Sequence, residues 1–363
     1  MDKRIVINML SSADKIEGQG VKSAYEEQVK LVSEGAPELF EVHINSLKKS
    51  DIQHSHTLDP QNYLRMLNNK GANICYVHFL PDTLEGSIQL PKPFFKLFQK
   101  YVISFYSMAD YLIVVNPSFI PALESYGIER DKIVYIPNYV SKELFYRHDD
   151  EKRKQLRLQY QVAEDAFCVV GVGQVQTRKG VLDFIEVAKK LPHITFLWAG
   201  GFSFGVITDG YSELKEVVEH PPKNVRFVGI LPREQMNDFY NVADVLFMPS
   251  YNELFPMSIL EAVNLHIPLV LRDLELYEDI LFHKYLKGNH NDAFVEAIQH
   301  LYQDKGFYLL SSLSSKEISE YYSKENVLGI WKDFYTKVYT EQESGILLEN
   351  RRRERMNKKG KND

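Results

Sequence analysis

Residues 245–262 of this 363-residue chain are VLFMPSYNELFPMSILEA, an apolar strand-like run followed by a short loop and a helix start. Pro256 suits the first helical position, because proline has a fixed φ and no N–H to leave unpaired. The amides of that first turn, with the positive end of the helix dipole behind them, favour an anion. Glu253 on the loop and Glu261 on the second turn place a carboxylate on each side, where hydroxyls can bind. An anion and a polyol together indicate a nucleotide-sugar.

Length and composition limit the class of protein. A chain of 363 residues exceeds one compact core, so two domains are expected. The formal net charge of −6 argues against a general nucleic-acid binder. Cys75 and Cys168 lie in apolar runs, which predicts buried, reduced thiols in a cytosolic protein. No apolar stretch has the length of a signal peptide or a spanning helix, so any membrane contact is expected to be peripheral.

Strand-like runs alternate with helical patterns in two series. The runs of the first series are 4–10, 40–44, 74–78, 111–115 and 133–136, and those of the second are 167–172, 194–199, 225–228, 245–248 and 269–271. This alternation predicts an α/β protein with two doubly wound parallel sheets. We place the domains at 1–147 and 148–323, followed by a helix over about 324–341 and a basic tail over 342–363.

Ligands of doubly wound sheets bind beyond the carboxyl ends of the strands, so the loops after strands carry the candidate residues. Gly18 and Gly20 follow the first strand and leave room for a ligand, although a plain glycine turn is the alternative. Arg178 and Lys179 follow the first strand of the second domain and suit a diphosphate, although a solvated loop is the alternative. Gln174 lies in the same loop.

Three further strand ends supply candidates. Gly200 and Gly201 line the predicted cleft unless they form only a flexible turn. Backbone groups at Ile230 are placed to bind a base edge. His78 ends a strand of the first domain, where both a structural role and a functional role remain open.

These segments, in this order, resemble the retaining glycosyltransferases of family 4, which have the GT-B fold of two Rossmann-like domains. The resemblance covers nearly the whole chain and is most specific at Glu253 and Glu261, which match the family's E-x7-E motif. Two positions depart from the family pattern: Gln174 replaces an arginine, for which Arg178 would compensate, and Tyr139 replaces a glycine at the domain junction. Within the family, the chain is similar to Gram-positive enzymes that add a second hexose to monoglucosyl-diacylglycerol.

The resemblance implies a role for each candidate. The first domain would bind the acceptor and the second the nucleotide-sugar, with the C-terminal helix crossing back to the first. Glu261 would bind the ribose of UDP, and Glu253 the donor hexose. Arg178 and Lys179 would neutralise the departing diphosphate, while Gly18, Gly20 and His78 would contact phosphate and sugar. The helix start would face the phosphates through Leu254, Phe255, Pro256, Met257 and Ser258.

The implied function is transfer of glucose or galactose from UDP-glucose or UDP-galactose to glucosyl-diacylglycerol, which makes the diglycosyl lipid that anchors lipoteichoic acid. It would take place on the inner face of the cell membrane and require neither metal nor cofactor. A soluble glycan or polysaccharide acceptor is an alternative. Glycoside hydrolysis, a salt-bridging role of both glutamates and a non-catalytic sugar-binding partner are alternatives of other classes.

Residues 91–106, PKPFFKLFQKYVISFY, predict a membrane-facing helix. The aromatic residues Phe94, Phe95 and Phe98 share one face, and lysines including Lys92 and Lys96 recur every four residues on another. Aromatic residues flanked by lysines are typical of a helix in an anionic membrane interface. A buried helix with solvated lysines is the alternative, and from Val102 onwards core is expected. The basic tail would either add attraction to the membrane or form a disordered end.

Overall fold

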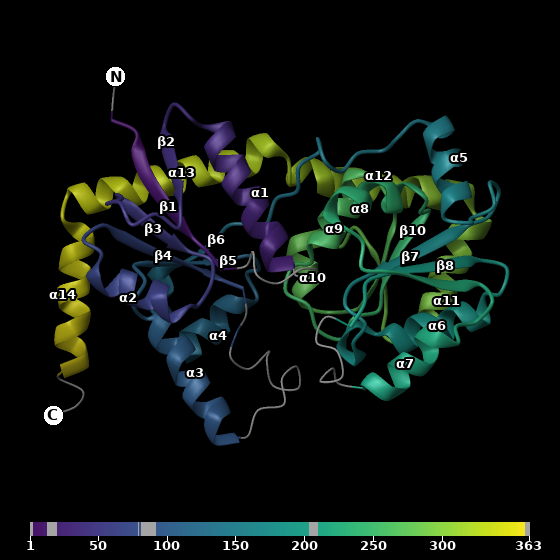
Figure 1. The fold of residues 1–363 in the computed structure, drawn as a ribbon, viewed down its shortest axis with the longest axis horizontal. Helices are drawn as coiled ribbons and strands as arrows, with labels where there is room; N and C mark the ends of the chain where they lie inside the picture. The colour runs from purple at the N-terminus through teal and green to yellow at the C-terminus, as the bar shows by residue number, and fades with distance from the viewer. Residues whose placement is uncertain (1–2, 13–19, 79, 81–91, 203–209, 360–363) are drawn as a thin grey trace. The chain divides into compact units, whose positions relative to one another are not determined.

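A computed structural model describes residues 3–12, 20–78, 80, 92–202 and 210–359 of the chain, and these form two compact units (Figure 1). Unit 1 combines the first strand with Val21–Asn138 and Lys324–Asp363. Unit 2 is formed by Tyr139–Ser323. The chain therefore leaves unit 1, builds unit 2 and returns to unit 1 for its last two helices.

The sheet of unit 1 has six parallel strands in the order β2-β1-β3-β4-β5-β6. The strands are β1 (Ile5–Leu10), β2 (Phe40–Ile44), β3 (Ile52–Ser55), β4 (Ala72–Val77), β5 (Tyr111–Val114) and β6 (Ile133–Tyr135). The connecting helices are α1 (Gly20–Gly35), α2 (Pro60–Asn68), α3 (Lys92–Tyr106), α4 (Phe119–Ser125) and the 3-10 turn η3 (Arg130–Lys132). Strands β4 and β5 are buried along their whole length, as expected for a sheet covered on both faces.

Helix α13 (Lys324–Glu343) covers one face of this sheet together with α1 (Figure 1). Its Tyr335 hydroxyl lies 2.8 Å from Nδ1 of His54 on β3 and accepts a hydrogen bond of 3.0 Å from Gln28 on α1. Trp331 packs on the same histidine. Helices α2 and α3 lie against one another on the other face (Figure 1), where the rings of Tyr63 on α2 and Tyr101 on α3 have centroids 5.9 Å apart. The Tyr101 hydroxyl also donates to the carbonyl oxygen of Leu58, just before α2, at 2.7 Å.

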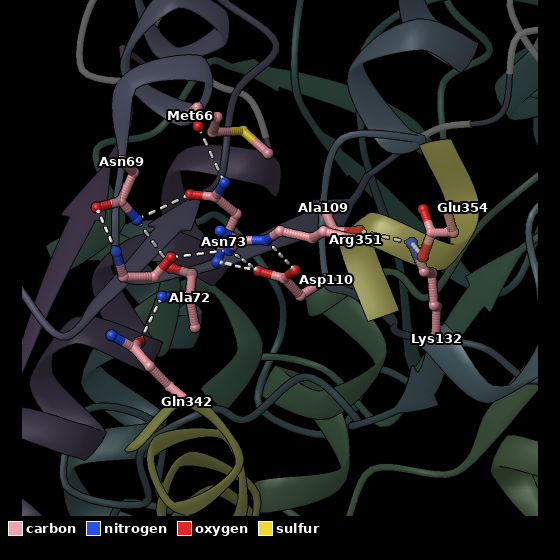
Figure 2. Close-up of polar contacts among 11 residues, drawn as sticks. Met66, Asn69, Ala72, Asn73, Ala109, Asp110, Lys132, Gln342, Arg351 and Glu354 are labelled. Carbon is pink, nitrogen blue, oxygen red and sulfur yellow. Dashed lines mark hydrogen bonds and ion pairs between the residues drawn. The ribbon is translucent and has the colours of Figure 1, made fainter. Parts of the chain in front are cut away.

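The final helix, α14 (Ile346–Lys359), is held to unit 1 by charged side chains (Figure 2). Arg351 donates from Nε and Nη2 to the two carboxylate oxygens of Asp110 at 2.7 and 2.5 Å. The Asp110 side chain is only 5% exposed and also accepts from the Asn73 amide at 2.7 Å. Lys132 and Glu354 form a second ion pair at 2.5 Å. Segments far apart in sequence are thereby joined at the amino ends of β4 and β5.

Unit 2 has a second six-stranded parallel sheet in the order β12-β11-β10-β7-β8-β9. The strands are β7 (Cys168–Val172), β8 (Thr195–Ala199), β9 (Val225–Gly229), β10 (Val245–Met248), β11 (Leu269–Arg272) and β12 (Leu286–Gly288). The helices are α5 (Asp150–Gln159), α6 (Val181–Lys190), α7 (Tyr211–Glu219), α8 (Arg233–Asn241), α9 (Met257–Asn264), α10 (Leu276–Leu281), α11 (Asn291–Gln303) and α12 (Lys305–Tyr321), with the 3-10 turn η4 (Thr177–Lys179). Helices α6, α7 and α11 cover one face, and α5, α8, α9 and α12 the other (Figure 1).

The predicted fold class is confirmed: two doubly wound parallel sheets are present, and all ten predicted strands occur. Strands β3 and β12, together with α5 and α12, were not predicted. The expectation of a disordered basic end is wrong for 346–359, because α14 is a helix whose Arg351 is anchored to a buried carboxylate. The preceding helix also runs to Glu343, two residues beyond the predicted end.

Candidate functional site

The carboxyl ends of three neighbouring strands of unit 2 are glycines with left-handed backbone conformations. Gly173 after β7, Gly200 after β8 and Gly229 ending β9 have φ values of 145°, 142° and 79°. The Gly200 amide donates to the Gly229 carbonyl oxygen at 2.8 Å, and a Cβ on Gly200 would lie 1.8 Å from the Gly173 oxygen. Other residues are strongly disfavoured in such a conformation, so these glycines let the strand ends approach closely.

Lys179 and Glu253 form the central ion pair of the site. Lys179 in η4 and Glu253 in the loop before α9 place Nζ and Oε1 2.5 Å apart, and the two side chains are 13% and 6% exposed. Burial lowers the pKa of the Lys179 ammonium, and the Glu253 carboxylate opposes that effect. The structure therefore brings together two residues with separate predicted ligands, the diphosphate for Lys179 and the donor hexose for Glu253.

The loop that carries Glu253 is anchored on both sides. The Arg178 side chain donates from Nη1 to the Asn252 carbonyl oxygen at 2.8 Å, and the backbone carbonyl oxygen of Arg178 accepts from the Tyr251 amide at 2.8 Å. From the other side Arg272 on β11 donates to the Pro249 carbonyl oxygen at 2.9 Å and stacks on the Tyr251 ring. Arg178 is thus bound to the glutamate loop.

Glu261 lies on the second turn of α9, as predicted, and is 5% exposed. Arg233 donates from Nη1 to its Oε1 at 2.8 Å, and the Tyr240 hydroxyl donates to its Oε2 at 2.8 Å. Neither partner was predicted from the sequence. Their seven-residue spacing on α8, which places two side chains on one helical face, was the available signal.

The remaining candidates in unit 2 differ in accessibility. Helix α9 begins at Met257, one residue later than predicted, with Pro256 as its cap. Phe255 is buried against Tyr322, and Ile230 is 52% exposed beside Gly201. Gln174 accepts from Gln176 at 2.7 Å, Leu254 is partly buried, and the Ser258 hydroxyl lies 3.3 Å from the Met248 sulfur.

In unit 1, His78 directly follows β4 and stacks on Tyr76 with ring centroids 4.5 Å apart. Its Nε2 is buried and has no hydrogen-bond partner within the described part of the chain. Burial lowers the pKa of His78 to about 4, so the ring is neutral near pH 7 and suits a hydroxyl better than a phosphate. Gly18 lies outside the described residues, and Gly20 begins α1.

Helix α3 has different exposure at its two ends. Phe94 and Leu97 are 63% and 67% exposed, Phe95 and Phe98 are partly buried, and Val102 is fully buried. The expectation that the later part of the segment is core is therefore met. Lys96 and Lys100 are exposed, whereas the Lys92 side chain lies outside the described residues.

Comparison with known proteins decides the family. The sequence profile described as "Glycosyl transferases group 1" matches residues 152–328. The alpha-galactosylglucosyldiacylglycerol synthase of Streptococcus pneumoniae is 46% identical over 92% of this chain and 90% of its own length. The chain belongs to the group 1 glycosyltransferases. A processive diacylglycerol alpha-glucosyltransferase of Acholeplasma laidlawii is 28% identical over 71% of this glycosyltransferase and 80% of its own length.

Solved structures share the fold of this glycosyltransferase. The Anabaena protein HepE, determined in complex with UDP-glucose, has a TM-score of 0.75 at 12% identity over 92% of this chain and 100% of its own. Sucrose-phosphate synthase of Thermosynechococcus elongatus also has a TM-score of 0.75, at 16% identity over 93% and 100%. The predicted family and the GT-B fold are thereby confirmed.

The described residues also bear on membrane-spanning segments and on metal sites. None of the helices in these ranges has both the length and the apolar character needed to cross a membrane. Three or more His, Cys, Asp or Glu side chains do not gather into a possible metal site anywhere in the described segments.

Proposed function

We propose that this glycosyltransferase moves a hexose, glucose or galactose, from its UDP-sugar to glucosyl-diacylglycerol at an anionic membrane, with retention of anomeric configuration. The observation that carries the proposal is the 46% identity, over nearly the whole chain, to a synthase named for galactosylglucosyldiacylglycerol. The proposed place is the inner face of the cell membrane, in the synthesis of a lipoteichoic acid anchor.

The proposed donor site uses the ion pair of unit 2. Glu253 accepts hydrogen bonds from hexose hydroxyls. The Lys179 ammonium, whose Nζ lies 2.5 Å from Oε1 of Glu253, binds the diphosphate. Arg178 supports the loop and adds charge, and Glu261 holds the ribose. His78, with its neutral ring, donates to or accepts from a sugar hydroxyl.

In the proposed reaction the hexose passes directly from UDP to the acceptor, and no protein side chain acts as a nucleophile. The bond between the anomeric carbon and the β-phosphate oxygen breaks, and a bond from that carbon to the acceptor hydroxyl oxygen forms on the same face. The hydroxyl proton passes to the departing diphosphate. Fixed cations stabilise the negative charge that develops on the leaving group, which is the largest contribution such a site offers. We propose that a metal is not required, so an excess of EDTA should leave the rate unchanged.

The proposed membrane contact lies on α3 and its neighbour α2. Phe94 and Leu97 are exposed on α3 beside exposed lysines. Helix α2, joined to α3 by a 2.9 Å hydrogen bond between Tyr63 and Ser104, exposes Leu64 and Leu67, each 59%. Apolar side chains beside lysines suit an interface of anionic lipids.

One assay tests the acceptor and donor together. The purified protein is incubated with radiolabelled UDP-glucose or UDP-galactose and vesicles that contain glucosyl-diacylglycerol, and the linkage of the product is determined by mass spectrometry and NMR. A diglycosyl lipid is expected from one donor. Transfer to soluble glycans alone would refute the lipid acceptor, and binding of UDP-sugar without any transfer would favour a non-catalytic partner.

A second assay tests the membrane contact. The double substitution Phe94→Ser and Leu97→Ser should weaken sedimentation with anionic vesicles and slow lipid glycosylation while UDP binding is retained. Leu158→Ser is the matched control, because Leu158 is 81% exposed on α5 of the other unit. Equal losses in both variants would contradict a membrane role of α3.

A further inference from the structure

Glu261 is held at both of its carboxylate oxygens by side chains that neither the family motif nor the comparisons assign. Arg233 binds Oε1 and Tyr240 binds Oε2, each at 2.8 Å. One donor on each oxygen fixes the plane of the carboxylate about its terminal torsion, which is otherwise soft. The carboxylate, 5% exposed, therefore has one defined orientation.

Both donors are themselves held in place by the same aromatic ring. The Arg233 guanidinium lies over the ring of Phe145 at 5.1 Å, and Tyr240 packs edge-on against that ring with centroids 6.0 Å apart. Tyr240 is fully buried. Burial and the Glu261 charge raise the pKa of its hydroxyl, so the hydroxyl keeps its proton and remains a donor.

The number of bonds on Glu261 indicates what it can still bind. An ionised carboxylate has about four acceptor positions, two on each oxygen. With Arg233 and Tyr240 in place, about one position remains on each oxygen. A vicinal diol, such as the 2′- and 3′-hydroxyls of a ribose, supplies one O–H donor for each of them.

We propose that Tyr240, assisted by Arg233, is a positioning residue that makes the donor site selective for a ribonucleotide over its 2′-deoxy counterpart. The proposal rests on the proposed function, in which Glu261 holds the ribose of UDP. Tyr240 touches Glu261 and acts through it. Without its hydroxyl, Oε2 loses its fixed donor, and the carboxylate rotates away from the orientation that suits two adjacent hydroxyls.

The test compares UDP with 2′-deoxyuridine diphosphate by titration calorimetry. The wild-type protein should bind UDP about tenfold more tightly than the deoxy nucleotide, as expected for a hydrogen bond to a charged group. Tyr240→Phe should weaken UDP binding about tenfold and the deoxy nucleotide far less, so the selectivity ratio should fall towards one. In turnover the variant should raise KM for the donor more than it lowers kcat.

The matched control is Tyr322→Phe, which removes another buried phenol hydroxyl of unit 2, bonded to the Ile280 carbonyl oxygen at 2.7 Å. It should leave the selectivity ratio unchanged, because the hydrogen bond that it removes goes to the Ile280 carbonyl oxygen, whereas that of Tyr240 goes to Glu261. Arg233→Gln should lower the ratio in the same direction as Tyr240→Phe.

The outcomes separate this inference from the function on which it rests. If the wild-type protein binds UDP but Tyr240→Phe weakens both nucleotides equally, Tyr240 only joins α8 to α9 and the inference is overturned. Equal wild-type affinity for the two nucleotides also overturns it. If the wild-type protein does not bind UDP at all, the proposed function itself fails.

Discussion

Substitution of Arg351 by alanine tests whether α14 stabilises unit 1. The change removes two charge-assisted hydrogen bonds to Asp110 and one of 2.8 Å to the Gly71 carbonyl oxygen. Asp110 is then left buried with the Asn73 amide as its remaining partner in Figure 2. Removing one partner of a buried pair costs about 3–5 kcal/mol, and since the Arg351 side chain is 24% exposed we expect about 2–3 kcal/mol.

The chain offers a reporter for this unit alone. Its two tryptophans are Trp331 on α13 of unit 1 and Trp198 on β8 of unit 2. In a Trp198→Phe background, Trp331 is the remaining tryptophan. Its fluorescence, recorded as a function of urea concentration, then gives the free energy of unfolding of unit 1. Arg351→Ala should move the midpoint to lower urea without changing the slope, because the surface exposed on unfolding is unchanged.

Arg353→Ala is the control, since the Arg353 side chain is 70% exposed and its contact with Glu349 on the same helix is 4.0 Å long. It should cost less than about 0.5 kcal/mol. Asp110→Asn in the Arg351→Ala background should recover part of the loss by removing the unpaired charge. Equal, small effects of the two arginine substitutions on the free energy of unfolding would refute the reasoning, because they would show that α14 does not stabilise unit 1.

Lys179→Met should lower the rate of sugar transfer by about two orders of magnitude, and adding Glu253→Gln should lower it little further, as steady-state kinetics would show for residues that act as a pair. Gly180→Ala should destabilise unit 2 by about 1–3 kcal/mol in thermal unfolding, because φ is 69° and the new Cβ would lie 2.3 Å from the Pro249 oxygen. Gly329→Ala, with open space around it on α13, should instead stabilise by about 0.5–1 kcal/mol. Burial lowers the pKa of His54 to about 3 in the folded state. The unfolded chain therefore becomes protonated at this residue at a higher pH than the folded protein does. Acidification from about pH 7.5 to about pH 5 should lower the free energy of unfolding of unit 1 by about 2 kcal/mol through His54, as measured by Trp331 fluorescence. An unfolding free energy that is flat over this range would contradict a neutral, buried ring.

The strands that could be predicted are those whose burial is visible in their own composition. Residues 74–77 of β4 and 245–248 of β10 are apolar runs that any covered parallel sheet needs. Strand β3 has the sequence IQHS, and His54 within it is buried because Trp331 and Tyr335 pack over it. Trp331 and Tyr335 follow much later in the chain, so the local sequence around β3 does not predict that the strand is buried.

The candidate site also contains residues that the sequence predicts and residues that only the packing of helices brings together. Glu253 and Glu261 were predicted because a motif records their spacing in sequence. The partners Arg233 and Tyr240 are specified only by the packing of α8 against α9, which brings them to the carboxylate. The basic character of the final segment predicted either attraction to a membrane or a disordered end. Its Arg351 instead binds an internal carboxylate, because sequence alone does not say which charges have a partner inside the protein.

Unit 1 is assembled from both ends of the chain, which matters during synthesis on the ribosome. Unit 2 is complete once Ser323 has emerged, but one face of the first sheet still lacks α13 at that moment. Tyr76 and Phe40, which contact Trp331 and Tyr335 in the finished protein, must wait until the last helices are translated. Domains that finish early fold first, so the amino-terminal half is expected to depend on chaperones longest, and premature termination before α13 should yield an insoluble product with a folded second half.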